Sequence, residues 1–270
     1  DPATTEIYTL SLHDALPILG VSFYVYERRI ARFSPLTVAA LRVGFGAIFI
    51  VAIGRFIGQP LGEVSRTAGK RGWFFTIIIG LITVILPFLL LTWGLQHVPS
   101  AFAGITMGSL PVLILPLAYI FTPDEGIGPR RVAGVIVGFC GLLVLFGPGL
   151  IGTTLSAEAR LGQFACMGAA MCYAVGSVVT RRAPKMPPVA FAAGTLVVGA
   201  ICLVPVALYL EGIPQLTNGP STWAVLYLAA LPTGLAAVLR LQVITTAGSV
   251  FMSLTNFMVP LWSIVFGVVF

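Results

Sequence analysis

Residues 73–95 read WFFTIIIGLITVILPFLLLTWGL and contain no charged residue. A helix needs about 20 largely apolar residues to cross a bilayer, and inside lipid its backbone must close its own hydrogen bonds. This stretch therefore predicts one membrane-spanning helix. Seven further blocks meet the same criterion: 36–57, 101–121, 132–148, 161–180, 189–210, 223–246 and 249–270. Residues 19–27 resemble the second half of an earlier helix, so the predicted total is nine helices.

The composition of the whole chain predicts an all-α integral membrane protein. Hydrophobic residues make up 58% of the 270 residues and charged residues only 9%, whereas soluble domains carry about 25% charged residues. The 15 Lys and Arg residues are spread between apolar blocks, so they form no phosphate-binding stripe and nucleic-acid binding is excluded. All four cysteines lie in apolar runs, where free thiols pack as small hydrophobic groups, and this excludes a disulfide scaffold.

Residues 1–18, DPATTEIYTLSLHDALPI, differ in character from the rest of the chain. They hold three of the nine acidic residues, and the string resembles a translated sequencing adapter. We therefore leave them out of the predicted fold and expect the first helix to be incomplete. The chain stops at Phe270 inside an apolar run, and we expect it to be cut there too.

Basic residues in alternate loops predict the orientation of the helices. Four lie in the loops after helices 1, 3, 5 and 7, namely Arg28, Arg29, Arg32 and Arg160. Cytoplasmic loops are enriched in Lys and Arg, so the more basic set of loops is predicted to be cytoplasmic. That set follows helices 2, 4, 6 and 8 and carries nine: Arg55, Arg66, Lys70, Arg71, Arg130, Arg131, Arg181, Arg182 and Lys185.

The chain repeats itself at a shift of about 150 residues. Trp73 corresponds to Trp223 at a shift of 150, and Pro111 to Pro260 at 149. The repeat unit has five helices, an odd number, so the second copy must enter the membrane upside down. We predict an inverted repeat with units at 19–148 and 159–270, the second truncated before a tenth helix. In such proteins the substrate site lies near the midplane, between the halves.

Four segments carry a family resemblance: SPLTVAALR at 34–42, the stretch from Trp93 to Pro111, PRRVAG at 129–134, and Phe251 through Pro260. With these segments, residues 19–270 resemble an EamA-type member of the drug/metabolite transporter superfamily. The resemblance implies ten helices in two inverted halves around a central cavity, and the outward transport of small metabolites such as amino acids. Half of helix 1 and all of helix 10 are missing from this pattern.

Polar residues on one face of a membrane helix mark either a wet cavity or a contact between helices. Tyr173 and Ser177 lie on such a face of the helix 161–180, and Ser253 and Asn256 on one of the helix 249–270. We interpret the two stripes together as cavity lining, although helix packing remains the alternative for each residue alone. The predicted substrate-binding residues are Trp93, Thr106, Ser109, Tyr173, Ser177, Arg240, Ser253 and Asn256.

Arg240 is the most informative of these residues, because it lies inside an apolar helix. An intramembrane charge predicts a functional site, and a guanidinium can hold a substrate carboxylate. The alternative is that Arg240 reaches the lipid headgroups, which is the favoured interpretation for Arg42. Trp93 has an alternative too, as an interfacial anchor. No Asp or Glu lies at mid-depth in a predicted helix, so we expect uniport or exchange, or coupling through Glu27.

The sequence contains no P-loop, no metal-ligand cluster and no nucleophile paired with a base. We therefore expect no cofactor, no bound metal and no enzymatic activity. The predicted function is a secondary exporter of small organic metabolites in the bacterial cytoplasmic (inner) membrane. Its expected partners are a small-molecule substrate and the lipid bilayer, and a homodimer is left open. A structural or assembly subunit without transport is the alternative, and a membrane enzyme is the least favoured one.

Overall fold

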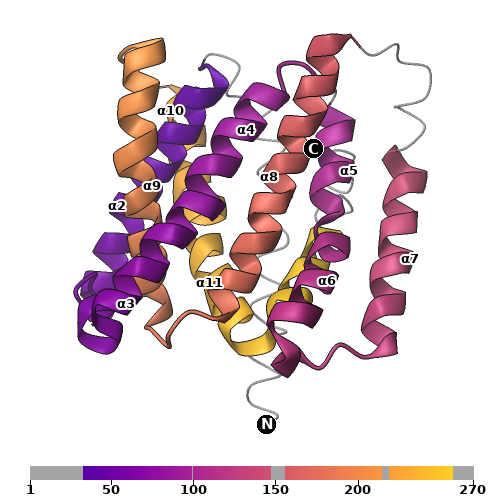
Figure 1. The fold of residues 1–270 in the computed structure, drawn as a ribbon. Coiled ribbons are helices and arrows are strands. Elements are labelled where there is room, and N and C mark those ends of the chain that lie inside the picture. The colour runs from indigo at the N-terminus through magenta and orange to yellow at the C-terminus, as the bar shows by residue number, and fades with distance from the viewer. Residues whose placement is uncertain (1–32, 99, 147–155, 215–218, 258–270) are drawn as a thin grey trace.

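The computed structural model describes residues 33–98, 100–146, 156–214 and 219–257, which form helices and short connections (Figure 1). Within these ranges, six helical spans are long and apolar enough to cross a membrane. They are Pro35–Phe56, Glu63–Gly94, Phe102–Phe121, Ala157–Arg181, Pro188–Glu211 and Ser221–Ala247. Residues 249–257 are also helical. The chain is thus a helical multi-pass membrane protein, as predicted. The predicted first helix lies outside the described residues, so the count of nine stays a prediction.

The helices run back and forth between two ends of a bundle. End A holds Ser34 and Glu211, whose side chains form a hydrogen bond, and end B holds Asp124 and Arg181, which form an ion pair. End A is at the top of Figure 1. The elements in chain order are α2 (Pro35–Phe56), α3 (Glu63–Gly80), η1 (Leu81–Ile85), α4 (Leu86–Gly94), α5 (Ser100–Gly108), α6 (Leu110–Phe121), η2 (Pro123–Glu125), α7 (Pro129–Phe146), α8 (Ala157–Arg181), α9 (Pro188–Glu211), α10 (Pro220–Leu228), η4 (Ala229–Leu235) and α11 (Ala236–Ala247).

Helices α2 and α9 form the centre of the larger hydrophobic core. Membrane helices associate through close packing of small residues rather than through the hydrophobic effect. Ala190, Ala192 and Ala193 of α9 are accordingly buried. Gly199 also lies in close contact with a neighbouring segment, since a Cβ there would lie 2.6 Å from a methyl group of Val84. The backbones of α2, α9 and the η1 segment therefore approach to the limit that glycine and alanine allow.

Two spans contain a π-helical turn, and the two turns occupy related positions. Residues 81–85 are η1 in the span Glu63–Gly94, and a shift of 150 maps them onto 231–235, within η4. Proline explains the widened turns, because its ring clashes with the carbonyl four residues earlier and it donates no backbone hydrogen bond. Pro87 is the second residue after η1, and Pro232 lies within η4. The first span runs from end B to end A, and the second runs the opposite way.

The structure extends one predicted helix and divides another. The helix predicted over 73–95 begins at Glu63, and Gly69 interrupts it with a φ of 55°. That angle suits glycine, since a side chain is strained there. The span 100–121 is divided at Ser109, and Pro111 lies in the first turn of α6. Proline is tolerated in a first turn because its missing N–H has no partner to lose there.

Candidate functional site

Three of the predicted substrate-binding residues meet on α8 and α11. Arg240 of α11 donates a hydrogen bond from Nη2 to Oγ of Ser177 over 3.2 Å. Its guanidinium carbon lies 5.1 Å from the centre of the Tyr173 ring. Arg240 precedes the end of α11 at Ala247 by seven residues, about 10 Å along a helix. We call Tyr173, Ser177 and Arg240 the arginine cluster.

The geometry of the arginine cluster follows from helix periodicity and from a second contact nearer end B. Tyr173 and Ser177 are four residues apart and therefore share one face of α8. Ser177 donates its hydroxyl hydrogen to the carbonyl oxygen of Tyr173 over 2.8 Å, so its oxygen is oriented to accept from Arg240. One turn further on, Nη1 of Arg181 donates to the carbonyl oxygen of Thr245 over 2.6 Å. This contact fixes the relative position of α8 and α11.

The described groups in contact with Arg240 are electrically neutral. They are a hydroxyl and an aromatic ring, and the two ion pairs of the described residues, Arg66–Glu63 and Arg181–Asp124, lie elsewhere. A charged side chain within a membrane helix is costly unless it is paired or lies in a wet cavity. An anionic ligand at this position would supply the opposite charge and would accept two parallel hydrogen bonds from the guanidinium. The arginine cluster can therefore bind a carboxylate.

Arg42 approaches the same region from α2. Its Nε donates to Oγ1 of Thr233 over 3.2 Å, and its guanidinium carbon lies 6.0 Å from the centre of the Phe88 ring. The side chain thus contacts α4 and η4 instead of extending to the headgroups, contrary to the favoured interpretation. The signal was present in the sequence, since Arg42 interrupts an apolar helix just as Arg240 does.

Four other predicted residues form hydrogen bonds within their own helices. Thr106 donates to the carbonyl oxygen of Phe102, and Ser109 to that of Thr106. Ser253 donates to the carbonyl oxygen of Val250, and Asn256 to that of Ser253. Side chains whose hydrogen bonds are made within their own helix suit a packed interface and the wall of a cavity equally well. Their role in binding stays a prediction.

Trp93 lies apart from the arginine cluster, near end A. Its side chain is 43% exposed, and its ring centre is 4.6 Å from that of His97. This position suits an anchor at the membrane surface, the alternative considered for Trp93. Glu27 lies outside the described residues, so its proposed coupling role stays a prediction.

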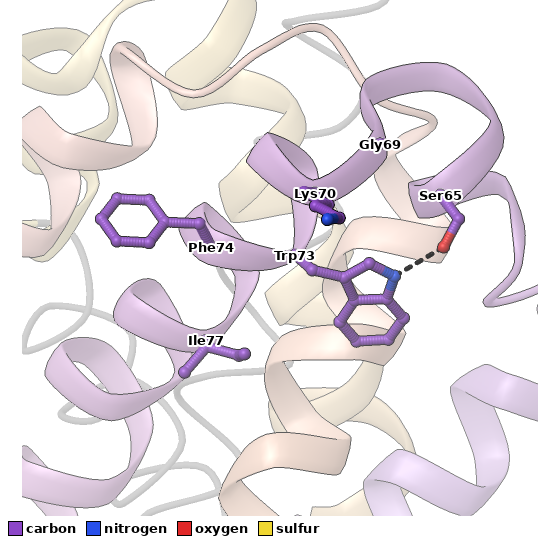
Figure 2. A pocket seen from close by; sticks show the side chains of 6 residues that line it. All are labelled: Ser65, Gly69, Lys70, Trp73, Phe74 and Ile77. Carbon is purple, nitrogen blue, oxygen red and sulfur yellow. Dashed lines mark hydrogen bonds between the residues drawn. The ribbon is translucent and has the colours of Figure 1, made fainter.

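A shallow pocket of about 570 Å³ lies on α3 at end B (Figure 2). It contains none of the predicted substrate-binding residues, and a single helix provides its lining. Its walls are formed by Ser65, Gly69, Lys70, Trp73, Phe74 and Ile77. No group of three or more His, Cys, Asp or Glu residues able to hold a metal ion occurs in the described ranges.

The described chain is a bundle of apolar membrane-spanning helices in which an arginine on α11 contacts α8. Two regions, residues 15–147 and 160–270, each match the model of the EamA-like transporter family. The chain belongs to the EamA-like transporter family, so the predicted family is confirmed. Since the family is one of transporters, the prediction that the chain is not an enzyme is confirmed as well.

Individual relatives agree with this family. The uncharacterized transporter YoaV of Bacillus subtilis is 22% identical over 252 residues, covering 93% of this chain and 84% of that protein. The aromatic amino acid exporter YddG of Ancylobacter novellus is 32% identical over 147 residues, covering 54% of this chain and 48% of that protein. A crystal structure with 23% sequence identity superimposes with a TM-score of 0.82 over 98% of this chain and 88% of the other, which shows the shared fold.

Proposed function

We propose that the protein is a secondary exporter of small organic metabolites that carry a carboxylate, with amino acids as the favoured class. The observation that carries this proposal is Arg240, a cation inside a membrane helix whose described contacts are neutral. The similarity over half the chain to an exporter of aromatic amino acids supports the same class of substrate. The proposed location is the bacterial cytoplasmic membrane.

The arginine cluster is suited to bind both ends of such a substrate. The guanidinium of Arg240 can pair with the carboxylate, while the Tyr173 ring offers an aromatic face to an apolar or aromatic side chain. Thr106, Ser109, Ser253 and Asn256 are proposed to line the rest of the cavity. Val250 supports the proximity of the helix 249–257 to the arginine cluster, because it packs in one hydrophobic cluster with residues of α6 and α8, and Tyr173 packs against the same cluster.

Transport would proceed by alternating access of two inverted halves. Two observations support the inverted repeat: the family model matches the chain twice, and the related π-helical turns lie in spans that run in opposite directions. The nine basic residues assigned to cytoplasmic loops lie at end B, and Arg160 lies in the first turn of α8 at end A. This distribution supports a cytoplasmic end B. Uniport, exchange and coupling through Glu27 remain the proposed alternatives for energy coupling.

Export from cells that overproduce the protein tests the proposed function. Loss of a hydrogen-bonded charge costs about 1.5–3 kcal/mol, so Arg240→Ala should lower export of an aromatic amino acid about 10- to 100-fold. Arg240→Lys should retain part of the activity, because it keeps the charge without the planar fork. Lys185→Ala is the matched control, since Lys185 is an exposed cation at end B. Full export by Arg240→Ala would disprove the assigned site, and no export by the parent would favour the non-transporting subunit.

A further inference from the structure

Helix α3 changes character at Gly69, where it enters the apolar part of the bundle. The segment before Gly69 contains Glu63, Ser65 and Arg66, whereas the segment from Trp73 onward is apolar. Gly69 has a φ of 55°, so the two segments meet at an angle instead of continuing one helix. The shallow pocket on α3 lies at this junction (Figure 2).

The wall of this pocket nearest end B is polar and positively charged. The indole N–H of Trp73 donates to Oγ of Ser65 over 2.7 Å, as Figure 2 shows. A hydroxyl that accepts a hydrogen bond still has its own hydrogen to donate. Lys70 lies beside them, is exposed, and takes part in neither of the two ion pairs of the described residues. Ser65 and Lys70 together can therefore bind an anionic oxygen.

The wall of the pocket toward end A is apolar and faces away from the bundle. Phe74 and Ile77 of this wall are 59% and 50% exposed, and Leu81, which lies beyond the pocket in η1, is 42% exposed. Spacings of three and four residues place the three side chains on one helical face, on the end A side of Lys70. In a bilayer these side chains contact lipid chains. The pocket thus combines a cation and a hydroxyl at the membrane surface with an apolar strip that continues from them toward end A.

We propose that this pocket binds an anionic phospholipid of the leaflet at end B. The phosphate would pair with the ammonium group of Lys70 and accept a hydrogen bond from Ser65, and an acyl chain would lie along Phe74, Ile77 and Leu81. Charge complementarity favours an anionic headgroup, because nine basic residues lie at end B and Lys70 pairs with no acidic group among the described residues. The exposed apolar strip favours a lipid over free phosphate, which would leave that strip unused.

Fluorescence quenching by brominated lipids tests this proposal on the full chain in nanodiscs. Trp73 lines the pocket, so the difference in quenching between the parent and Trp73→Phe isolates its signal from the other tryptophans. Brominated phosphatidylglycerol and brominated phosphatidylcholine are compared as the anionic and the zwitterionic lipid. A cation near the membrane surface contributes about 1 kcal/mol, so half-maximal quenching should need about fivefold less phosphatidylglycerol. Inorganic phosphate at millimolar concentration should leave the quenching unchanged.

Variants of Lys70 test whether this cation causes the preference for phosphatidylglycerol. Lys70→Gln should remove the preference for phosphatidylglycerol, Lys70→Arg should keep it, and Lys185→Gln, at the same end but outside the pocket, should keep it too. Equal quenching by both lipids in the parent, or an unchanged preference in Lys70→Gln, overturns the proposal. Competition by inorganic phosphate would also overturn it, in favour of a simple anion site. The retained preference of Lys70→Arg separates loss of the charge from loss of folding.

Discussion

The ring of Tyr173 on α8 is in contact with an arginine from another helix. The guanidinium carbon of Arg240 on α11 lies 5.1 Å from the centre of this ring, whereas the guanidinium of Arg42 on α2 lies over the ring of Phe88. An aromatic ring attracts a cation through its negative face. The ring of Tyr173 would then hold the guanidinium of Arg240 in place for a ligand, and its hydroxyl would be secondary.

This role predicts different effects for two substitutions of Tyr173. A cation–π contact contributes about 0.5–2 kcal/mol, so Tyr173→Ala should raise the apparent KM for export about 2- to 30-fold. Tyr173→Phe keeps the ring and should stay within about twofold of the parent. The measurement is initial export rate against internal substrate concentration. An equal rise in the apparent KM in both variants would assign the effect to the hydroxyl instead of the ring.

The arginine cluster was predictable from sequence only in part. Helix periodicity placed Tyr173 and Ser177 on one face, and the rule that intramembrane charges are functional singled out Arg240. Arg42 satisfied the same rule, but it lies near the end of its helix. Contact with the lipid headgroups was therefore equally consistent with the sequence. Its hydrogen bond to Thr233 depends on how α2 packs against η4, and no local pattern in either helix specifies that packing.

At the scale of elements, apolar runs defined the spans well but their interruptions poorly. The helix predicted from Trp73 is preceded by a polar helical segment from Glu63, and the two segments meet at a kink at Gly69. The π-helical turns at 81–85 and 229–235 have no periodic signal of their own. Pro87 indicated a disturbance, but whether proline kinks, widens or ends a helix depends on the neighbours that satisfy the displaced carbonyls.

Packing of α9 against η1 provides a stability prediction for an element. A Cβ on Gly199 would lie 2.6 Å from a methyl group of Val84 and 3.1 Å from one of Val43. Such overpacking costs about 1–3 kcal/mol, so Gly199→Ala should lower the thermal midpoint of the protein in detergent. Gly134→Ala on α7 is the matched control, because a Cβ there meets nothing within 4 Å.

The two glycine variants should therefore differ clearly in thermal midpoint. Alanine is a better helix former than glycine, so Gly134→Ala should leave the midpoint unchanged or raise it slightly. If Gly199→Ala were as stable as Gly134→Ala, α9 and η1 would not approach as closely as the structure shows.

At the scale of the whole molecule, polar contacts join the two halves at both ends. At end A, Ser34 and Thr37 donate hydrogen bonds to the carboxylate of Glu211 on α9. At end B, Arg181 of α8 pairs with Asp124 of η2 over 3.0 Å. In alternating access, each end opens while the other is closed. Contacts that cross between the halves at an end therefore resist its opening.

The ion pair at end B predicts a measurable change in this equilibrium. Asp124 is 65% exposed, so the pair contributes only about 0.2–1 kcal/mol. Asp124→Asn should accordingly increase opening of end B about 1.5- to 5-fold. Thr180 is buried near the end B terminus of α8 and is 1% exposed. In a chain without its native cysteines, Thr180→Cys should then react faster with a water-soluble maleimide when Asp124 is replaced.

Glu63→Gln supplies the matched control for that measurement. Glu63 forms the other ion pair of the described residues, with Arg66, but both partners belong to α3 and therefore to the same half. Removing it changes the charge at end B by the same amount without releasing a contact between the halves. If Glu63→Gln accelerated labelling as much as Asp124→Asn, the effect would come from the surface charge. A faster reaction in Asp124→Asn alone would identify the pair with Arg181 as a contact that holds end B closed.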